Sequence, residues 1–170
     1  MKIEIQFERS KDPRIDYYYV YRSKTPFFKE GAHPVMKIKQ PFLPTPKRVN
    51  ERAIKNNGKF TLKYPIVDGK EKEIVVKNEG QTIKKEQYVV VNSRHIILHE
   101  NMNINEIDVS YDADVIVVKD HKEPQKYVEY YGPEINIKEN DKDTIYYYIQ
   151  GFGLSGIYSN KIVKIPAIMK

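Results

Sequence analysis

The sequence predicts an all-β fold, a sandwich or a barrel, and three features of the 170-residue chain support this prediction. Apolar and polar residues alternate in many short segments, as they do in strands with one buried face. These segments recur at intervals of 8–15 residues, with Gly, Pro, Asn and Asp between them. Only one segment carries helical signals, and it is short.

We expect a strand wherever this alternation is sustained. In chain order the expected strands are 2–7, 17–21, 35–39, 60–67, 73–77, 87–91, 95–99, 107–111, 115–119, a segment around 135–137, 146–150 and 161–165. Gln40–Pro46 contains three prolines, which lack an amide donor, so this segment is expected to be an extended linker. Thr45, Pro46 and Gly58 then mark the start and the end of a short helix or a loop.

Three tight turns are expected, each closing a β-hairpin. Asp68-Gly69 separates two alternating segments and suits a two-residue turn, because both residue types tolerate positive φ. Asn92-Ser93-Arg94 separates the next pair of strands. Asp112-Ala113-Asp114 separates the third pair.

Composition excludes several classes of function. The chain has no cysteine, which rules out disulfides and Cys-based zinc or nucleophile chemistry. Its net charge of +6 comes mainly from scattered lysines, so we expect a solvated surface and no nucleic-acid partner. No segment approaches the ~18 apolar residues of a membrane span. The N-terminal MKIEIQFER lacks the apolar run of a signal peptide, so we expect no membrane partner and synthesis in the cytoplasm.

Residues that could carry chemistry are few. His95 and His99 fall in an expected strand, where a four-residue offset separates them by about 13 Å, too far for one metal ion. Four aspartates between Asp108 and Asp120 could offer oxygens to calcium, but their spacing is not that of a calcium loop. No phosphate-binding loop or nucleophile elbow is present. We therefore expect no enzyme activity, no metal and no cofactor. The alternating tyrosines suit either cross-strand packing or stacking against sugars or bases.

Both ends of the chain resemble a fibronectin type III domain. IEIQFERSKDPRIDYYYVYRSKTPF resembles strands B and C of that family, with Phe7 where a core Trp is common. INIKENDKDTIYYYIQGFGLSGIYSNKIVKI resembles strands E, F and G. Thr144 and Tyr146 match the tyrosine corner, which implies a structural role for Tyr146. Strand A is missing from the matched segments.

This resemblance implies a discontinuous fibronectin type III-like sandwich of residues 1–40 and 133–170, interrupted by a hairpin-rich β subdomain of residues 41–132. Within the insertion, QYVVVNSRHIILHENMNINEIDVSYDAD resembles a β module that is frequent in the virion proteins of tailed bacteriophages. Together the two resemblances imply a structural protein of a phage tail, baseplate or neck, assembled in the host cytoplasm. Its partners would be other virion proteins or further copies of itself in a ring.

The missing strand A would leave an open sheet edge, which can pair with another chain. The alternative function is a carbohydrate- or receptor-binding accessory module of a phage or bacterial surface system. The candidate interface residues are Ile3, Ile5 and Phe7 on the open edge, with Asp68, Gly69, Asn92 and Arg94 in the inserted hairpins.

Overall fold

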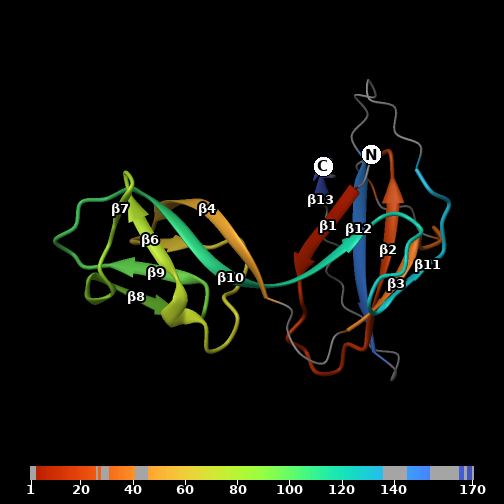
Figure 1. Ribbon diagram of the computed structural model, residues 1–170, viewed down its shortest axis with the longest axis horizontal. Coiled ribbons are helices and arrows are strands. Elements are labelled where there is room, and N and C mark those ends of the chain that lie inside the picture. Colours follow the sequence, from red (N-terminus) through yellow and green to blue (C-terminus); the bar gives the residue numbers. More distant parts are fainter. Residues whose placement is uncertain are drawn as a thin grey trace. The chain divides into compact units, whose positions relative to one another are not determined.

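A computed structural model describes residues 3–25, 27, 31–40, 46–135, 145–153, 165–166 and 168–169 (Figure 1). Across these residues the chain is all-β, which confirms the predicted class: two antiparallel sheets are accompanied only by two single-turn 3-10 helices. The elements are β1 (Ile3–Glu8), β2 (Tyr17–Ser23), β3 (Met36–Lys39), β4 (Pro46–Asn56), β5 (Lys59–Thr61), η1 (Glu71–Glu73), β6 (Val75–Asn78), β7 (Gln81–Thr82), η2 (Lys85–Gln87), β8 (Tyr88–Val91), β9 (His95–Leu98), β10 (Glu106–Lys119), β11 (Val128–Tyr130), β12 (Tyr146–Phe152), β13 (Ile165–Pro166) and β14 (Ile168–Met169).

The chain forms two compact units. Residues 1–43 and 116–170 make the first unit, and residues 44–115 make the second. The second unit is therefore inserted into the first, but it ends at residue 115, whereas the resemblance had placed the boundary at residue 132. The difference arises from β10, whose first part pairs with β4 and β6 in the second unit and whose end belongs to the first unit.

The predicted turn at Asp112-Ala113-Asp114 is wrong, because these residues lie inside the 14-residue strand β10. They are paired on both sides. On one side they face Pro46–Arg48 of β4, and on the other Ala113 forms a bridge with Ile66. Ala113 is fully buried. Turn-forming residue types are thus overridden here by pairing with two neighbouring segments.

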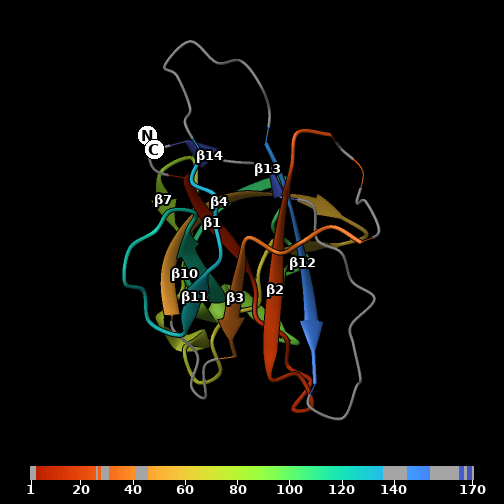
Figure 2. The ribbon, with the colours of Figure 1, turned by 90° about the vertical axis from the view of Figure 1, so that its right-hand side faces the viewer.

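The first unit is a β-sandwich. One layer is the sheet β11-β3-β2-β12-β13, and the other is β14-β1 with the end of β10 (Figure 2). Inward side chains from both layers form a single core, as expected when two sheets bury one face each. The fully or largely buried members of this core are Ile3, Ile5, Phe7, Ile15, Tyr18, Val20, Val35, Met36, Ile38, Ile116, Val118, Ile145, Tyr147 and Ile149.

The edge of strand β1 that the missing strand A would leave open is paired at its first two residues. Ile3 and Glu4 pair with Met169 and Ile168 of β14, and β10 lies on the other side of β1. The side chains of Ile3, Ile5 and Phe7 point into the core, with exposures of 2%, 1% and 2%. These three residues therefore stabilise the sandwich and offer no side-chain surface to a partner.

The second unit is built on the sheet β10-β4-β5-β9-β8, which curls around its own apolar core, with β6 and β7 beside β10 (Figure 1). The helix considered after Thr45 is wrong, because Pro46–Asn56 is the strand β4. Val49 and Ala53 lie four residues apart, and an even offset puts them on one strand face as well as on one helix face. The described part of the Gln40–Pro46 linker is limited to its two end residues.

Two of the predicted turns are present. Val67 to Lys70 form a turn around Asp68-Gly69, closed by a 2.9 Å bond from the amide of Lys70 to the carbonyl of Val67. It does not close a hairpin, because β5 and β6 pair with other strands. The turn at Asn92-Ser93 does join the hairpin β8–β9, and both residues have positive φ, 53° and 55°.

Candidate functional site

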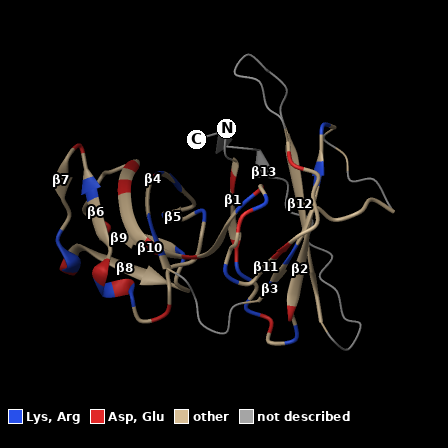
Figure 3. Ribbon diagram, turned by 45° about the vertical axis from the view of Figure 1, so that its right-hand side comes forward, with Lys and Arg blue, Asp and Glu red and all other residues tan. Residues whose placement is uncertain are grey.

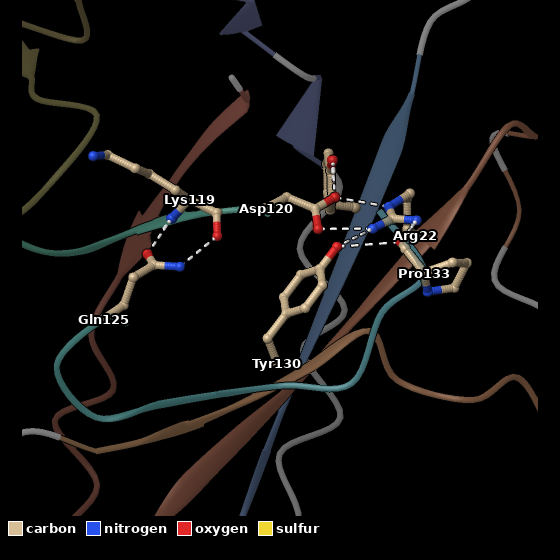
Figure 4. A network of polar contacts seen from close by, with 7 residues as sticks. Arg22, Lys119, Asp120, Gln125, Tyr130 and Pro133 are labelled. Atoms are coloured by element: carbon tan, nitrogen blue, oxygen red, sulfur yellow. Dashed lines mark hydrogen bonds and ion pairs between the residues drawn. The ribbon is translucent and has the colours of Figure 1, made fainter. Parts of the chain in front are cut away.

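A network of hydrogen bonds and one buried ion pair surrounds Asp120 in the first unit (Figure 4). The side chain of Asp120 has no exposed surface. Its two carboxylate oxygens accept hydrogen bonds of 2.7 Å from Nε and Nη2 of Arg22. The hydroxyl of Tyr147 donates to the same carboxylate at 2.5 Å. One carboxylate thus joins β2, β12 and the end of β10.

The network extends into the segment after β10. Arg22 also donates to the carbonyl of Pro133 at 2.9 Å, and Tyr130 lies 3.1 Å from Nη2 of Arg22. Burial raises the pKa of Tyr147 well above its usual range, and its hydrogen bond to Asp120 raises it further. Burial lowers the pKa of Arg22, but the hydrogen bonds and charge of Asp120 outweigh this and raise it.

Tyr147 is the neighbour of Tyr146, to which the resemblance assigned a structural role. Tyr147 is fully buried in the core, whereas Tyr146 is half-buried and belongs to the opposite face of β12. The structural role of Tyr146 stays a prediction, and a one-residue change of register in the strand would exchange the two tyrosines. Thr144, the other half of the predicted corner, lies outside the described residues.

The outward side of the five-stranded sheet carries a cluster of rings, which we call the aromatic face. Register pairs share a face, and Tyr17 pairs with Phe152 while Tyr21 pairs with Tyr148. The ring centroids of Tyr17 and Tyr19 are 5.2 Å apart, and Phe152 lies 5.5 Å and 5.2 Å from them. The aromatic face consists of Tyr17, Tyr19, Tyr21, Tyr148 and Phe152.

Polar groups border these rings. Lys37 places its ammonium nitrogen 4.5 Å from the ring centroid of Tyr17. Tyr131, which is 49% exposed, donates its hydroxyl to Glu129 at 3.0 Å. Burial and this bond raise the pKa of Tyr131 to about 12. At neutral pH its hydroxyl is therefore a hydrogen-bond donor. Glu129 pairs with Lys37 of β3, so Tyr131 lies at the border of the cluster.

A surface groove of about 980 Å³ adjoins the aromatic face and lies within the first unit. It is bounded by the loop between β1 and β2 and by the strands β3 and β11. The loop is held by a hydrogen-bonded chain, in which Tyr18 donates to Gln40 at 2.5 Å and accepts from the amide of Ser10 at 2.8 Å. Charged and aromatic residues line the groove: Arg9, Lys11, Asp12, Asp16, Tyr17, Lys37, Lys39, Tyr127 and Glu129.

The second unit presents a different surface, made of aliphatic side chains. Val89 and Ile97 are paired across β8 and β9 and are 55% and 37% exposed. Val91, 37% exposed, faces the same way from the end of β8. A shallow groove of about 410 Å³ lies over part of this surface. Ile54 of β4 is 67% exposed.

Strand β8 is also a sheet edge, since β9 is its one strand partner among the described residues. The backbone amide of His99, which follows β9, donates to the carbonyl of Gln87. Because such bonds alternate along a strand, the N–H and C=O groups of Val89 and Val91 point toward β9, and those of Tyr88 and Val90 point outward. No charged residue lies in Tyr88–Val91, whereas η2 just before it is charged (Figure 3). Natural edges usually carry such charges against unwanted pairing.

The remaining predicted interface residues lie in the second unit. Asp68 and Gly69 are exposed at the tip of their turn, and Asn92 and Arg94 lie in the turn that follows β8. Arg94 donates to the carbonyl of Lys63 at 3.2 Å. Only Asn92 and Arg94 are therefore next to the β8 edge.

The residues considered for metal binding are engaged elsewhere. His95 lies 3.0 Å from the hydroxyl of Thr61, and His99 lies 2.6 Å from the carbonyl of Glu86. Asp112 faces Arg48 at 3.4 Å, as Asp120 faces Arg22. Among the described residues no three potential ligands gather into a metal site. No helix in the described part of the chain is long and apolar enough to cross a membrane.

Comparisons with known proteins returned no family model, no curated protein and no solved structure that matches this chain.

Proposed function

We propose that the chain is a structural protein of a tailed-bacteriophage virion, in the tail, baseplate or neck, and that it works by docking to further copies of itself. The observation that carries the docking is the outer edge of β8, which is uncharged, has exposed valines and has no strand partner among the described residues. Such an edge offers unpaired N–H and C=O groups to another strand, and exposed aliphatic side chains add apolar contact.

The first unit supports the fibronectin type III-like part of the proposal. Its central strands follow the order β3-β2-β12-β13 in one layer and β1-β10 in the other. The order β2-β12-β13 fits the strands C, F and G of the resemblance. Strand E was placed in the segment from residue 133, but the strand beside β1 is the end of β10, which lies outside the matched segments. The β14 strand then stands where strand A would lie. The phage assignment itself rests on the second resemblance, which covers the hairpin β8–β9 and the start of β10.

A second copy is the occupant that the β8 edge fits best. Two β8 strands related by a two-fold axis pair in antiparallel fashion, and the outward groups of Val90 in each copy then face each other. This register sets Val89 opposite Val91 of the other copy. It also brings Glu86 opposite Arg94, so the ends of the paired strands carry opposite charges.

The self-pairing is tested by analytical ultracentrifugation of the whole chain. We expect a concentration-dependent dimer that Val89→Lys and Val91→Lys abolish, because lysines on the edge add repulsion. Val117→Lys is the matched control. Val117 and Val91 are both 37% exposed, but Val117 lies on β10 in the first unit. A chain that stays monomeric at every concentration would overturn the docking mechanism.

The register is tested by disulfide trapping. Because the native sequence has no cysteine, any disulfide must involve the introduced residues. Facing residues of a non-hydrogen-bonded antiparallel pair have Cα atoms about 4.5 Å apart, within the range of a disulfide. Val89→Cys mixed with Val91→Cys is expected to cross-link readily, and either variant alone far less. Equal cross-linking of one variant alone would overturn this register. The virion assignment is tested separately, by the presence of the chain in purified particles and of sheath, tube or portal genes beside its own.

A further inference from the structure

We infer that the aromatic face and the groove beside it form a binding site for a neutral oligosaccharide. This site lies entirely in the first unit and is independent of the docking edge. Tyr17, Lys37 and Glu129 link its two parts, because they line the groove and also lie at or beside the ring cluster.

The ring cluster supplies an apolar surface for the C–H faces of sugar rings. Tyr17, Tyr19 and Phe152 are the partly exposed members of the aromatic face, whereas Tyr21 and Tyr148 are buried beside them. Tyr19 is the central ring, with centroids of Tyr17, Phe152 and Tyr21 at 5.2, 5.2 and 6.5 Å. A rigid group of rings loses little conformational entropy when a ligand stacks on it.

The polar groups around the rings suit hydroxyls better than a charged ligand. A sugar hydroxyl both donates and accepts, so its site needs groups of both kinds. The groove offers cationic donors in Arg9, Lys11, Lys37 and Lys39, and acceptors in Asp12, Asp16 and Glu129. Four cations against three anions leave a nearly balanced charge. A nucleic acid or another polyanion would call for a uniformly basic surface.

The same surface is poorly suited to a protein strand. Strand β2 is paired on both sides, with β3 and with β12, so its backbone has no edge to offer (Figure 2). Among the described residues near the rings, the exposed apolar side chains are those of Tyr127 and Tyr131, which are aromatic. Rings with interspersed polar groups, over a groove of about 980 Å³, fit an extended chain of several sugar units.

The inference is tested with isothermal titration calorimetry of the full chain. The probes are cellohexaose, maltohexaose and chitohexaose, each raised to about 10 mM so that weak binding is detected. We expect at least one of them to bind. Absence of heat with all three would overturn the inference.

The position of the site is tested with paired variants of Tyr19. Tyr19→Ala removes the central ring and is expected to weaken binding at least tenfold, whereas Tyr19→Phe keeps the ring and is expected to stay within about threefold of the native affinity. Lys37→Ala leaves every ring in place and is expected to weaken binding by a smaller factor. Thermal melting checks that each variant is folded, and native affinity in a folded Tyr19→Ala protein would overturn the assignment.

If Tyr19→Ala does not fold, the site is tested with Lys37→Ala and Lys39→Ala instead. Both lysines are on the outward side of β3, opposite Tyr19 and Tyr17 in register, and removing either leaves the core intact. Loss of affinity in both variants would support the site, and native affinity in both would overturn it. Val89→Lys serves as the control in the other unit and is expected to bind saccharide normally.

Discussion

The two units expose surfaces of different chemistry, although both are built from antiparallel strands. In the first unit the exposed apolar groups of the central sheet are rings on strands that are paired on both sides. In the second unit they are aliphatic, and Val89 and Val91 lie on β8, whose outer side has no strand partner among the described residues. An open backbone edge recognises another strand, whereas a closed sheet recognises ligands through side chains alone. This is why we assign protein docking to one unit and saccharide binding to the other.

The interiors of the two units also differ, although each contains a buried tyrosine bonded to a carboxylate. In the second unit Tyr111 donates to Glu51 at 2.8 Å and accepts from the amide of Tyr64. In the first unit Tyr147 donates to Asp120, which is held by Arg22. The carboxylate of Asp120 is fully buried and ion-paired with Arg22, whereas Glu51, the carboxylate that Tyr111 contacts, is only half-buried.

The largest expected effect comes from breaking this ion pair. Asp120→Ala leaves the guanidinium of Arg22 largely buried without its carboxylate and removes the acceptor of Tyr147. We expect a loss of about 3–5 kcal/mol in the free energy of unfolding of the first unit. Urea unfolding followed by NMR signals of each unit measures it.

The matched control for this prediction is Asp108→Ala. Asp108 lies 3.5 Å from Arg52, and both side chains are more than half exposed. Removing it is expected to cost less than about 1 kcal/mol. Similar losses for the two variants would mean that the Asp120 network does not stabilise the first unit.

The two buried tyrosines give a finer comparison. Tyr147→Phe and Tyr111→Phe each remove a hydrogen bond to a carboxylate, so each is expected to cost about 1.5–3 kcal/mol. The first should lower the stability of the first unit, and the second that of the second unit. Unfolding curves are recorded separately for each unit. A loss of stability in the other unit, or in both, would contradict this prediction.

Tyr146→Phe tests the register of β12 in the same experiment. Because Tyr146 is half-buried on the outward face, we expect its change to cost less than about 0.5 kcal/mol. A larger cost for Tyr146→Phe than for Tyr147→Phe would show that the strand faces are exchanged.

The fold class followed from the sequence because alternation and turn residues are local signals. The partners of the strands did not follow, since pairing joins segments far apart in the chain. The alternation before and after Asp112–Asp114 was read as two strands because Asp is a turn former, and only the flanking segments at Pro46–Arg48 and Ile66 keep it extended. The pairing of β1 with β14 was equally hard to predict, since β14 comes from the other end of the chain.

The candidate sites were predictable to a smaller extent. Alternating tyrosines at Tyr17, Tyr19 and Tyr21 were a visible signal for one outward face, but the meeting with Phe152 depends on the register of β12 against β2. The β8 edge had a signal in its uncharged Tyr-Val-Val-Val run. That it is an edge is a property of the whole sheet and not of the segment.

The smallest expected effect concerns the loop that bounds the groove. The carboxylate of Asp12 accepts from the guanidinium of Arg14 at 2.9 and 3.0 Å and from its amide at 3.0 Å. These bonds lower the pKa of Asp12 to about 2. The usual pKa of an aspartate in an unfolded chain is about 3.9, so the ionised form favours the folded loop above that pH. The contribution is lost as the pH falls through about 2.

Carboxyl-carbon NMR titration measures this pKa directly, with Arg14→Gln as the comparison. The variant removes the charged donor but keeps a backbone amide at the same position, so the pKa of Asp12 is expected to rise toward about 3.9 without returning fully to it. The loop should then loosen at a higher pH than in the native chain, and saccharide affinity at pH 3 should fall further in the variant. An unchanged pKa in Arg14→Gln would show that the guanidinium does not hold the loop. The groove would then need another source of its shape, and Tyr18 with its bonds to Gln40 and Ser10 is the group that could provide it.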